Sequence, residues 1–281
     1  MKVAVVGLGL IGGSMALVLK EKGFASSVLG VDNQEAHREK ALELGIVDDV
    51  CDLNEAVANS DLIILSAPVS VCTTLLPLIL DQVTHQVVLD TGSTKTSLLE
   101  AVKGHARRGR YIATHPMWGT EFSGPEAATR DAFEGRANVI CNASESDKDA
   151  LSTVEKLYTL LGMYNVYMDG KDHDVHVAYV SHISHITSFA LANTVLEKER
   201  EENAIFELAS AGFESTVKLA KSSPAMWMPI FKQNKENVLD VLNEHITQHR
   251  KFKSCIEKEN WEYLSELMEQ ANKIKHVLDR K

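Results

Sequence analysis

A glycine-rich turn between a short apolar run and a helical pattern constrains the fold of this chain most. Residues 2–6 are rich in β-branched side chains, and the sequence GLGLIG follows directly at 7–12. Gly7 would permit the tight turn, Gly9 would let the backbone approach a pyrophosphate, and Gly12 would let the helix pack on the strand. The helix amino terminus would then face the anion. This pattern predicts a dinucleotide-binding strand, turn and helix.

A carboxylate at the end of the second predicted strand indicates which dinucleotide binds. That strand covers 27–31 and leads into Asp32, twenty residues after Gly12. A carboxylate there accepts a hydrogen bond from a ribose 2′-hydroxyl and repels a 2′-phosphate, so the sequence favours NAD over NADP. The residues that we expect to bind the cofactor are Gly7, Gly9, Leu10, Ile11, Gly12 and Asp32.

Strands and helices alternate up to about residue 168. Apolar runs that read as buried strands lie at 62–67, 87–90, 137–141 and 164–167. After them the strand signals disappear, and the sequence is helical almost to its end. We therefore expect an α/β Rossmann-type doubly wound parallel sheet at 1–168, followed by an all-α domain at 169–281.

Composition narrows the class of protein. The net charge of -10 argues against a nucleic-acid partner, because the phosphate backbone would be repelled. No apolar run approaches the length of a membrane span, so we expect no membrane partner. The four cysteines lack paired or metal-like spacing, as is typical of reduced thiols in a cytoplasmic protein.

The first candidate catalytic residue is a histidine near the end of a further apolar run. His115 is followed by Pro116 and, further on, by Gly124, which interrupt regular structure. Open α/β sheets bind ligands at the carboxyl ends of their strands, so His115 is either a site residue or a well-packed loop residue. Ser93 would lie along the same edge, where it either orients His115 or caps the next helix.

A long apolar helix is predicted from Val175 to about Arg200, buried in the middle of the second domain. At 100° per residue, one face of this region carries Asp174, His182 and His185. These side chains suit substrate binding, a hydrogen-bonded core, or a metal site. Because no further ligand is suitably spaced, we expect no metal.

The last third of the chain suggests an anion site and a dimer. Lys218 lies on a short helix that stops before Pro224, and it either binds an anionic substrate or is a solvated charge. Two amphipathic helical patterns follow, at 225–258 and 261–278. Two amphipathic helices supply more apolar surface than the core of the helical domain needs. We therefore expect a homodimer that associates through the helical domain.

With these residues in place, the chain resembles the prephenate/arogenate dehydrogenase family of tyrosine biosynthesis over nearly its whole length. The motifs that carry the resemblance lie at 6–14, 90–95, 114–124, 172–174 and 181–185. The first is common to many nucleotide-binding proteins, whereas the others in this order are more specific. The resemblance implies an amino-terminal Rossmann domain, a helical dimerisation domain and an active site between them, in the short monofunctional form of the family.

The resemblance also implies roles for individual residues. His115 would be the catalytic histidine, with Ser93 as its neighbour. The residues expected to bind or enclose the substrate are Glu121, Asp174, His182, His185, Lys218 and Trp227. One position departs from the pattern, because Lys218 stands where many members have an arginine that pairs with a substrate carboxylate. A lysine offers a point charge instead of a bidentate fork.

The expected activity is the NAD-dependent oxidative decarboxylation of prephenate to 4-hydroxyphenylpyruvate. The main alternative is arogenate as the substrate, which would give tyrosine directly. Another alternative is a 3-hydroxyacid dehydrogenase with a similar two-domain structure. Such an enzyme would usually place a lysine base on the helix that here carries His182 and His185. A further alternative is a non-catalytic NAD-sensing protein.

Overall fold

The computed structural model describes residues 1–202 and 205–279, which form two units. The first unit, 1–235, contains the whole sheet and helices α1 to α10. The second unit, 236–281, consists of most of α11 together with α12 and α13. All the predicted site residues belong to the first unit.

Eight strands form one sheet in the order β3-β2-β1-β4-β5-β6-β7-β8. The strands are β1 Lys2–Val6, β2 Ser27–Val31, β3 Asp49–Val50, β4 Leu62–Leu65, β5 Val87–Asp90, β6 Tyr111–Pro116, β7 Ala137–Cys141 and β8 Tyr164–Met168. The first six are parallel, in the order of a Rossmann fold, as the sequence predicts.

The predicted doubly wound sheet is confirmed, and its strands are parallel except at one pair. β7 runs antiparallel to β6, and β8 is parallel to β7. Between β6 and β7 the chain forms only a short 3-10 turn, η2 Pro125–Ala127, and no α-helix. A parallel neighbour is usually reached through a helical crossover, and the connection from β6 to β7 contains no α-helix.

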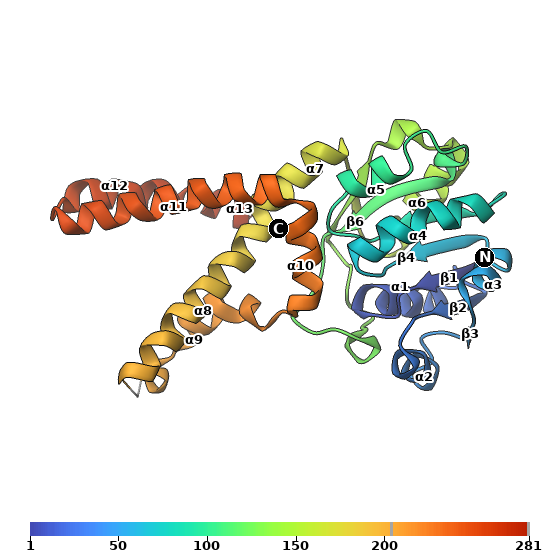
Figure 1. Ribbon diagram of the computed structural model, residues 1–281, viewed down its shortest axis with the longest axis horizontal. Helices are drawn as coiled ribbons and strands as arrows, with labels where there is room; N and C mark the ends of the chain where they lie inside the picture. The colour runs from blue at the N-terminus through green and yellow to red at the C-terminus, as the bar shows by residue number, and fades with distance from the viewer. Residues whose placement is uncertain (203–204, 280–281) are drawn as a thin grey trace. The chain divides into compact units, whose positions relative to one another are not determined.

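Helices cover both faces of the sheet (Figure 1). They are α1 Leu10–Glu21, α2 Glu35–Glu43, α3 Leu53–Ala58, α4 Val69–Gln82, α5 Thr96–Ala101 and α6 Lys148–Leu160. In β1, Val3 and Val5 pack into the cluster that α1 and α6 complete, whereas Ala4 and Val6 face the cluster under α3, α4 and α5. This alternation buries every second side chain on one face, as a doubly wound sheet requires.

A nearly continuous helical segment follows the sheet. It consists of α7 Gly170–Val177, a π-helical turn η4 at Ala178–His182, and α8 Ile183–Glu202. The segment begins five residues before the predicted start at Val175, because the Asp169 side chain caps it by accepting a hydrogen bond from the Lys171 N–H at 2.8 Å. Val180 is 67% exposed and Leu196 is 48% exposed, so the prediction that this helix is buried is wrong for the single chain.

Shorter helical elements follow α8 in the described part of the first unit. They are the 3-10 turn η5 Phe206–Leu208, α9 Ala211–Val217, the 3-10 turn η6 Lys218–Lys221, and α10 Pro224–Gln233. The Ser188 hydroxyl on α8 donates to the Thr216 carbonyl at 2.7 Å, which joins α8 to α9. Pro224 occupies the first turn of α10, where its missing N–H costs nothing.

The second unit is built from long and short helices, α11 Lys235–Glu257, α12 Trp261–Asn272 and α13 Lys275–Leu278. The Asn260 side chain caps α12 by accepting from the Tyr263 N–H at 3.2 Å. Large apolar side chains stay exposed in the single chain, with Trp261 at 58% and Met268 at 55%. Among the helices of the described residues, none has the length and apolar character needed to cross a membrane.

Candidate active site

The glycine turn between β1 and α1 has the shape of a phosphate-binding loop. Gly7 has φ +101°, and a Cβ there would lie 2.6 Å from the Ser66 carbonyl. A Cβ at Gly12 would collide with the Gly7 carbonyl oxygen. A Cβ at Gly9 would meet no atom within 4 Å, and no side chain caps α1. The turn therefore leaves open space at a helix amino terminus, which suits an anion.

Asp32 stands beside this turn at the end of β2. Its carboxylate accepts from the Leu8 N–H and the Gln34 N–H, both at 2.9 Å. His37 Nδ1 lies 3.4 Å from Oδ2, and the Arg38 guanidinium donates to the Asp32 carbonyl at 2.7 Å. Each carboxylate oxygen has two lone pairs, so a ribose hydroxyl can still donate to Asp32. The predicted cofactor residues thus lie together in an arrangement that fits a dinucleotide.

A buried ion pair joins the end of β5 to β6. Asp90 and Lys95 are both fully buried and form a salt bridge. Asp90 also accepts from the Tyr111 hydroxyl and the Gly92 N–H, each at 2.8 Å. Lys95 Nζ donates to the Thr114 carbonyl at 2.6 Å, one residue before His115. This network holds in place the strand end that carries the histidine.

His115 is the penultimate residue of β6, opposite Val139 of β7. Its Nδ1 lies 2.9 Å from Nε2 of His173, and Nδ1 of His173 lies 2.9 Å from Oδ1 of Asp174. Burial holds the pKa of His115 well below its usual range, and nearby His173, Lys95 and His182 lower it further. His115 is therefore neutral at pH 7, as a proton acceptor must be.

Ser93 lies half-buried in the loop between β5 and α5. Within the described residues its side chain makes no hydrogen bond, so it neither caps α5 nor orients His115 in this structure. The first N–H groups of α5 instead donate to Asp174, from Lys95 at 2.8 Å and from Thr96 at 2.9 Å. The helix-cap interpretation of Ser93 is wrong because a distant carboxylate takes that place.

The predicted helix face does bring Asp174 and His182 together, through Asn234. The Asn234 side-chain nitrogen donates to the Asp174 carbonyl at 2.7 Å and lies 3.2 Å from His182 Nδ1. His182 is buried, and this desolvation lowers its pKa to about 4. The Asp174 side chain is buried, and its carboxylate accepts from the Lys95 and Thr96 N–H groups and contacts His173 Nδ1. Its part in enclosing the substrate stays a prediction.

His185 and Trp227 form a second contact between predicted residues. Their ring centroids lie 3.6 Å apart with a tilt of 30°. His185 Nδ1 is 3.1 Å from the Ser181 carbonyl, one turn earlier. Trp227 also lies 5.8 Å from the His182 ring, centroid to centroid, in an edge-to-face arrangement. The aromatic side chain thus joins both histidines of this helix.

The two remaining predicted residues form an ion pair across distant parts of the chain. Lys218 Nζ lies 3.7 Å from the Glu121 carboxylate, which comes from the loop after β6. The Lys218 side chain is 56% exposed and that of Glu121 is 12% exposed. The lysine can therefore still reach an anion from solvent, and Glu121 is placed to compete for it.

Four residues at the centre of this site have no role in the sequence analysis. They are Asp90, Lys95, His173 and Asn234. Asp90, Lys95 and His173 fall inside motifs that support the resemblance, and a charged residue or histidine within such a motif is the available signal. Asn234 lies outside these motifs, at the C-terminal end of α10, so the sequence does not mark it as a site residue. Among the described residues, no group of three or more potential ligands is arranged to hold a metal ion.

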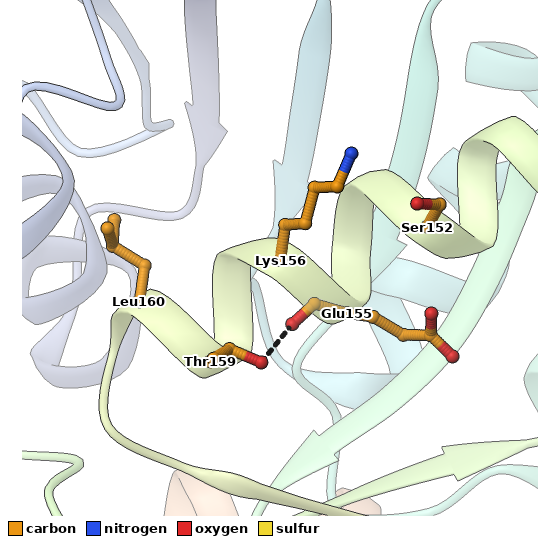
Figure 2. Close-up of a pocket in the computed structure, with 5 residues that line it drawn as sticks. All are labelled: Ser152, Glu155, Lys156, Thr159 and Leu160. Atoms are coloured by element: carbon orange, nitrogen blue, oxygen red, sulfur yellow. Dashed lines mark hydrogen bonds between the residues drawn. The ribbon is translucent and has the colours of Figure 1, made fainter.

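Figure 2 shows a different depression, on the outer surface of α6. It is lined by Ser152, Glu155, Lys156, Thr159 and Leu160. The Thr159 hydroxyl donates to the Glu155 carbonyl at 2.8 Å, and the Glu155 carboxylate accepts from Tyr167 at 2.6 Å. None of the predicted site residues lines it.

Comparison with known proteins identifies both domains of this chain. The nucleotide-binding domain of prephenate dehydrogenase matches residues 15–166, and its dimerization domain matches 169–270. A prephenate dehydrogenase of Bacillus subtilis is 30% identical over 93% of this chain and 72% of its own length. A cyclohexadienyl dehydrogenase of Zymomonas mobilis is 27% identical over 98% of this chain and 95% of its own.

A solved structure shows the same fold throughout. It is prephenate dehydrogenase from A. aeolicus in complex with hydroxyphenyl propionate and NAD+, which is 29% identical to this chain. The two match with a TM-score of 0.88 over 99% of each chain. The length covered, the two matched domains and the shared fold lead to one conclusion: this chain belongs to the prephenate dehydrogenase family.

Proposed function

We propose that this protein is an NAD-dependent prephenate dehydrogenase, which converts prephenate to 4-hydroxyphenylpyruvate and carbon dioxide. The observation that carries the proposal is the position of His115 at the carboxyl end of β6, 2.9 Å from His173, in a chain of this family. The related structure from A. aeolicus, with NAD+ and a hydroxyphenyl compound, supports both the cofactor and the class of ring substrate. Family membership makes a non-catalytic NAD sensor unnecessary as an explanation.

The turn at 7–12 and Asp32 would hold the cofactor. Gly7 and Gly12 keep the turn tight, and Gly9 leaves room for the pyrophosphate at the start of α1, where Leu10 and Ile11 provide the first turn. When bound, NAD accepts a hydride from the ring carbon that carries the hydroxyl group. The protein's part is to position that carbon and to manage the hydroxyl proton.

His115 would accept the proton of the ring hydroxyl as the hydride leaves. The ring carboxylate then leaves as carbon dioxide, and the electron pair of the broken bond enters the ring, which becomes aromatic. The ring oxygen regains a proton to give the phenol. Aromatisation drives the reaction, so the site mainly has to orient the substrate and polarise its hydroxyl group.

The other predicted residues would bind the remainder of the substrate. Lys218 offers a positive charge for the side-chain carboxylate, and Glu121 would occupy the lysine when that carboxylate is absent. His182 and His185 would line the pocket, with Trp227 packed against them. Ser93 would contact the hydroxyl group from the β5 edge.

A second candidate substrate is arogenate, which carries an amine in place of the keto group. The Zymomonas mobilis relative, a cyclohexadienyl dehydrogenase, keeps this candidate open. The deciding assay offers the purified protein prephenate or arogenate with NAD or NADP, in all four combinations, and follows the absorbance of the reduced nicotinamide. We expect the fastest reaction with prephenate and NAD. Preference for arogenate would change the substrate, and no reaction in any combination would overturn the proposal.

We also propose that the protein is a cytoplasmic homodimer, associated through its helical part. The exposed apolar side chains of Val180, Leu196 and Trp261, and the match to a dimerization domain, support association. The four cysteines are all free, which suits a reducing compartment. A functional division at 1–168 and 169–281 follows the two family matches, although the compact units divide after residue 235. A stable monomer at micromolar concentration in sedimentation would refute the dimer.

A further inference from the structure

We propose that His173 and Asp174 are positioning residues that set the tautomer of His115, with the proton on Nδ1 and a free lone pair on Nε2. This inference rests on the proposed role of His115 as the proton acceptor. It concerns residues behind the histidine, which do not touch the reacting atoms. It assigns to them a chemical task, in addition to their contribution to the fold.

Asp174 accepts hydrogen bonds from two backbone N–H groups at the start of α5. Its Oδ1 accepts from the Lys95 N–H at 2.8 Å, and its Oδ2 accepts from the Thr96 N–H at 2.9 Å. Burial by itself would raise the pKa of Asp174, but the hydrogen bonds from His173 and from the start of α5 outweigh it and lower that pKa. Asp174 is therefore an ionised carboxylate that only accepts.

The acceptor role of Asp174 determines which nitrogen of His173 carries a proton, and His173 in turn determines which nitrogen of His115 does. Since Asp174 only accepts, the 2.9 Å contact with His173 Nδ1 requires a proton on that nitrogen. Burial lowers the pKa of His173, so its ring is neutral and carries only this one proton. Its Nε2 is consequently an acceptor, and the 2.9 Å contact with His115 Nδ1 requires a proton on Nδ1 of His115.

Nε2 of His115 is then the atom that accepts the substrate proton. His115 is neutral, so a ring with its proton on Nδ1 has a lone pair on Nε2. The opposite tautomer would place two lone pairs against each other at the His115–His173 contact and lose that hydrogen bond. Once Nε2 is protonated, the Nδ1 proton still points at His173, with the Asp174 charge behind it.

The other titratable groups near His115 do not replace this arrangement. They are Lys95, whose ammonium group pairs with Asp90, and His182, which contacts Asn234. Both lower the pKa of His115, but neither accepts a hydrogen bond from its Nδ1. Among the described residues, His173 is the partner of that nitrogen.

The test uses the full-length protein and the variant His173→Gln, which keeps Asp174 in place as the cap of α5. We expect kcat with prephenate and NAD to fall about 10- to 100-fold, which does not exceed the lower end of the usual worth of a general base, while KM changes little. The matched control is His176→Gln, because His176 is exposed on the same helix and should leave kcat unchanged. The variant Asp174→Asn should give the same kcat loss if it folds.

A spectroscopic readout separates positioning from mere structural support. In 15N-histidine-labelled protein, with His115 assigned by its loss in His115→Asn, His115 should show a protonated Nδ1 and a bare Nε2. In His173→Gln this preference should weaken or reverse. A wild-type His115 protonated at Nε2, or a His173→Gln variant with unchanged kcat and tautomer, would overturn the inference. A wild type that turns over neither substrate would instead refute the proposed function, because the tautomer is measured without substrate.

Discussion

Replacing Lys95 with methionine should destabilise the protein strongly, because it leaves the Asp90 carboxylate buried without its cation. Neither residue of this pair is exposed. Removing one partner of a buried ion pair typically costs about 3–5 kcal/mol. Asp90 retains hydrogen bonds from Tyr111, Gly92 and the Thr114 N–H. These remaining donors stabilise the unpaired Asp90 carboxylate. We therefore expect the free energy of unfolding to fall by about 3 kcal/mol, near the lower end of that range.

The measurement is the free energy of unfolding in urea, followed by tryptophan fluorescence, for wild type and Lys95→Met. The matched control is Lys103→Met, which breaks an exposed pair with Glu100 (3.5 Å) and should cost no more than about 1 kcal/mol. The double variant Lys95→Met/Asp90→Asn should recover part of the loss, because the buried charge is gone as well. A loss below about 1 kcal/mol for Lys95→Met would refute the claim that this pair anchors the site.

Two further predictions concern the cofactor turn and the buried histidines. Gly9→Ala should leave the unfolding free energy unchanged but weaken NAD binding at least about 10-fold in calorimetry, whereas Gly12→Ala should destabilise the fold by about 1–3 kcal/mol through overpacking. Equal effects of the two substitutions on stability would contradict the geometry of the turn. The pKa of His182 is about 4 in the folded protein and about 6.5 unfolded, so the unfolded chain binds the proton first. Its contribution to stability is complete above pH 6.5 and is lost as the pH falls toward 4, by up to about 3 kcal/mol. In urea titrations at several pH values, the unfolding free energy of His182→Gln should fall less steeply with decreasing pH than that of the wild type. An identical pH dependence of the two proteins would contradict this prediction.

The sequence predicts most of the sheet, because buried strands leave a clear apolar pattern. The bounds of β5 and β7 agree with the predicted runs at 87–90 and 137–141. The direction of β7 does not follow from such a pattern, since it depends on the connection that precedes it. Strand β3 has only two residues, Asp49 and Val50, which is too short for any periodicity. The sequence predicts that α8 is buried, although Leu196 is 48% exposed, because an apolar pattern indicates burial without specifying the partner that provides it.

The sequence predicts the types of site residues better than their contacts. His115 and Asp174 are apparent as candidates, but the link between them passes through His173, 58 residues from His115. In the same way, the carboxylate that caps α5 belongs to Asp174, 79 residues from Lys95. From the sequence alone, Ser93 is the nearby candidate for this capping role. Local propensity favours the nearer group, and only the packing of α7 against α5 brings the distant carboxylate to the helix end.

The most direct test of the whole account is the turnover of the variant His115→Asn with prephenate and NAD. Asparagine can still donate a hydrogen bond toward His173, but it cannot accept the hydroxyl proton. We expect kcat to fall by about two orders of magnitude or more, with little change in KM for prephenate or in NAD affinity. Near-normal turnover in this variant would contradict the role of His115 as the catalytic base.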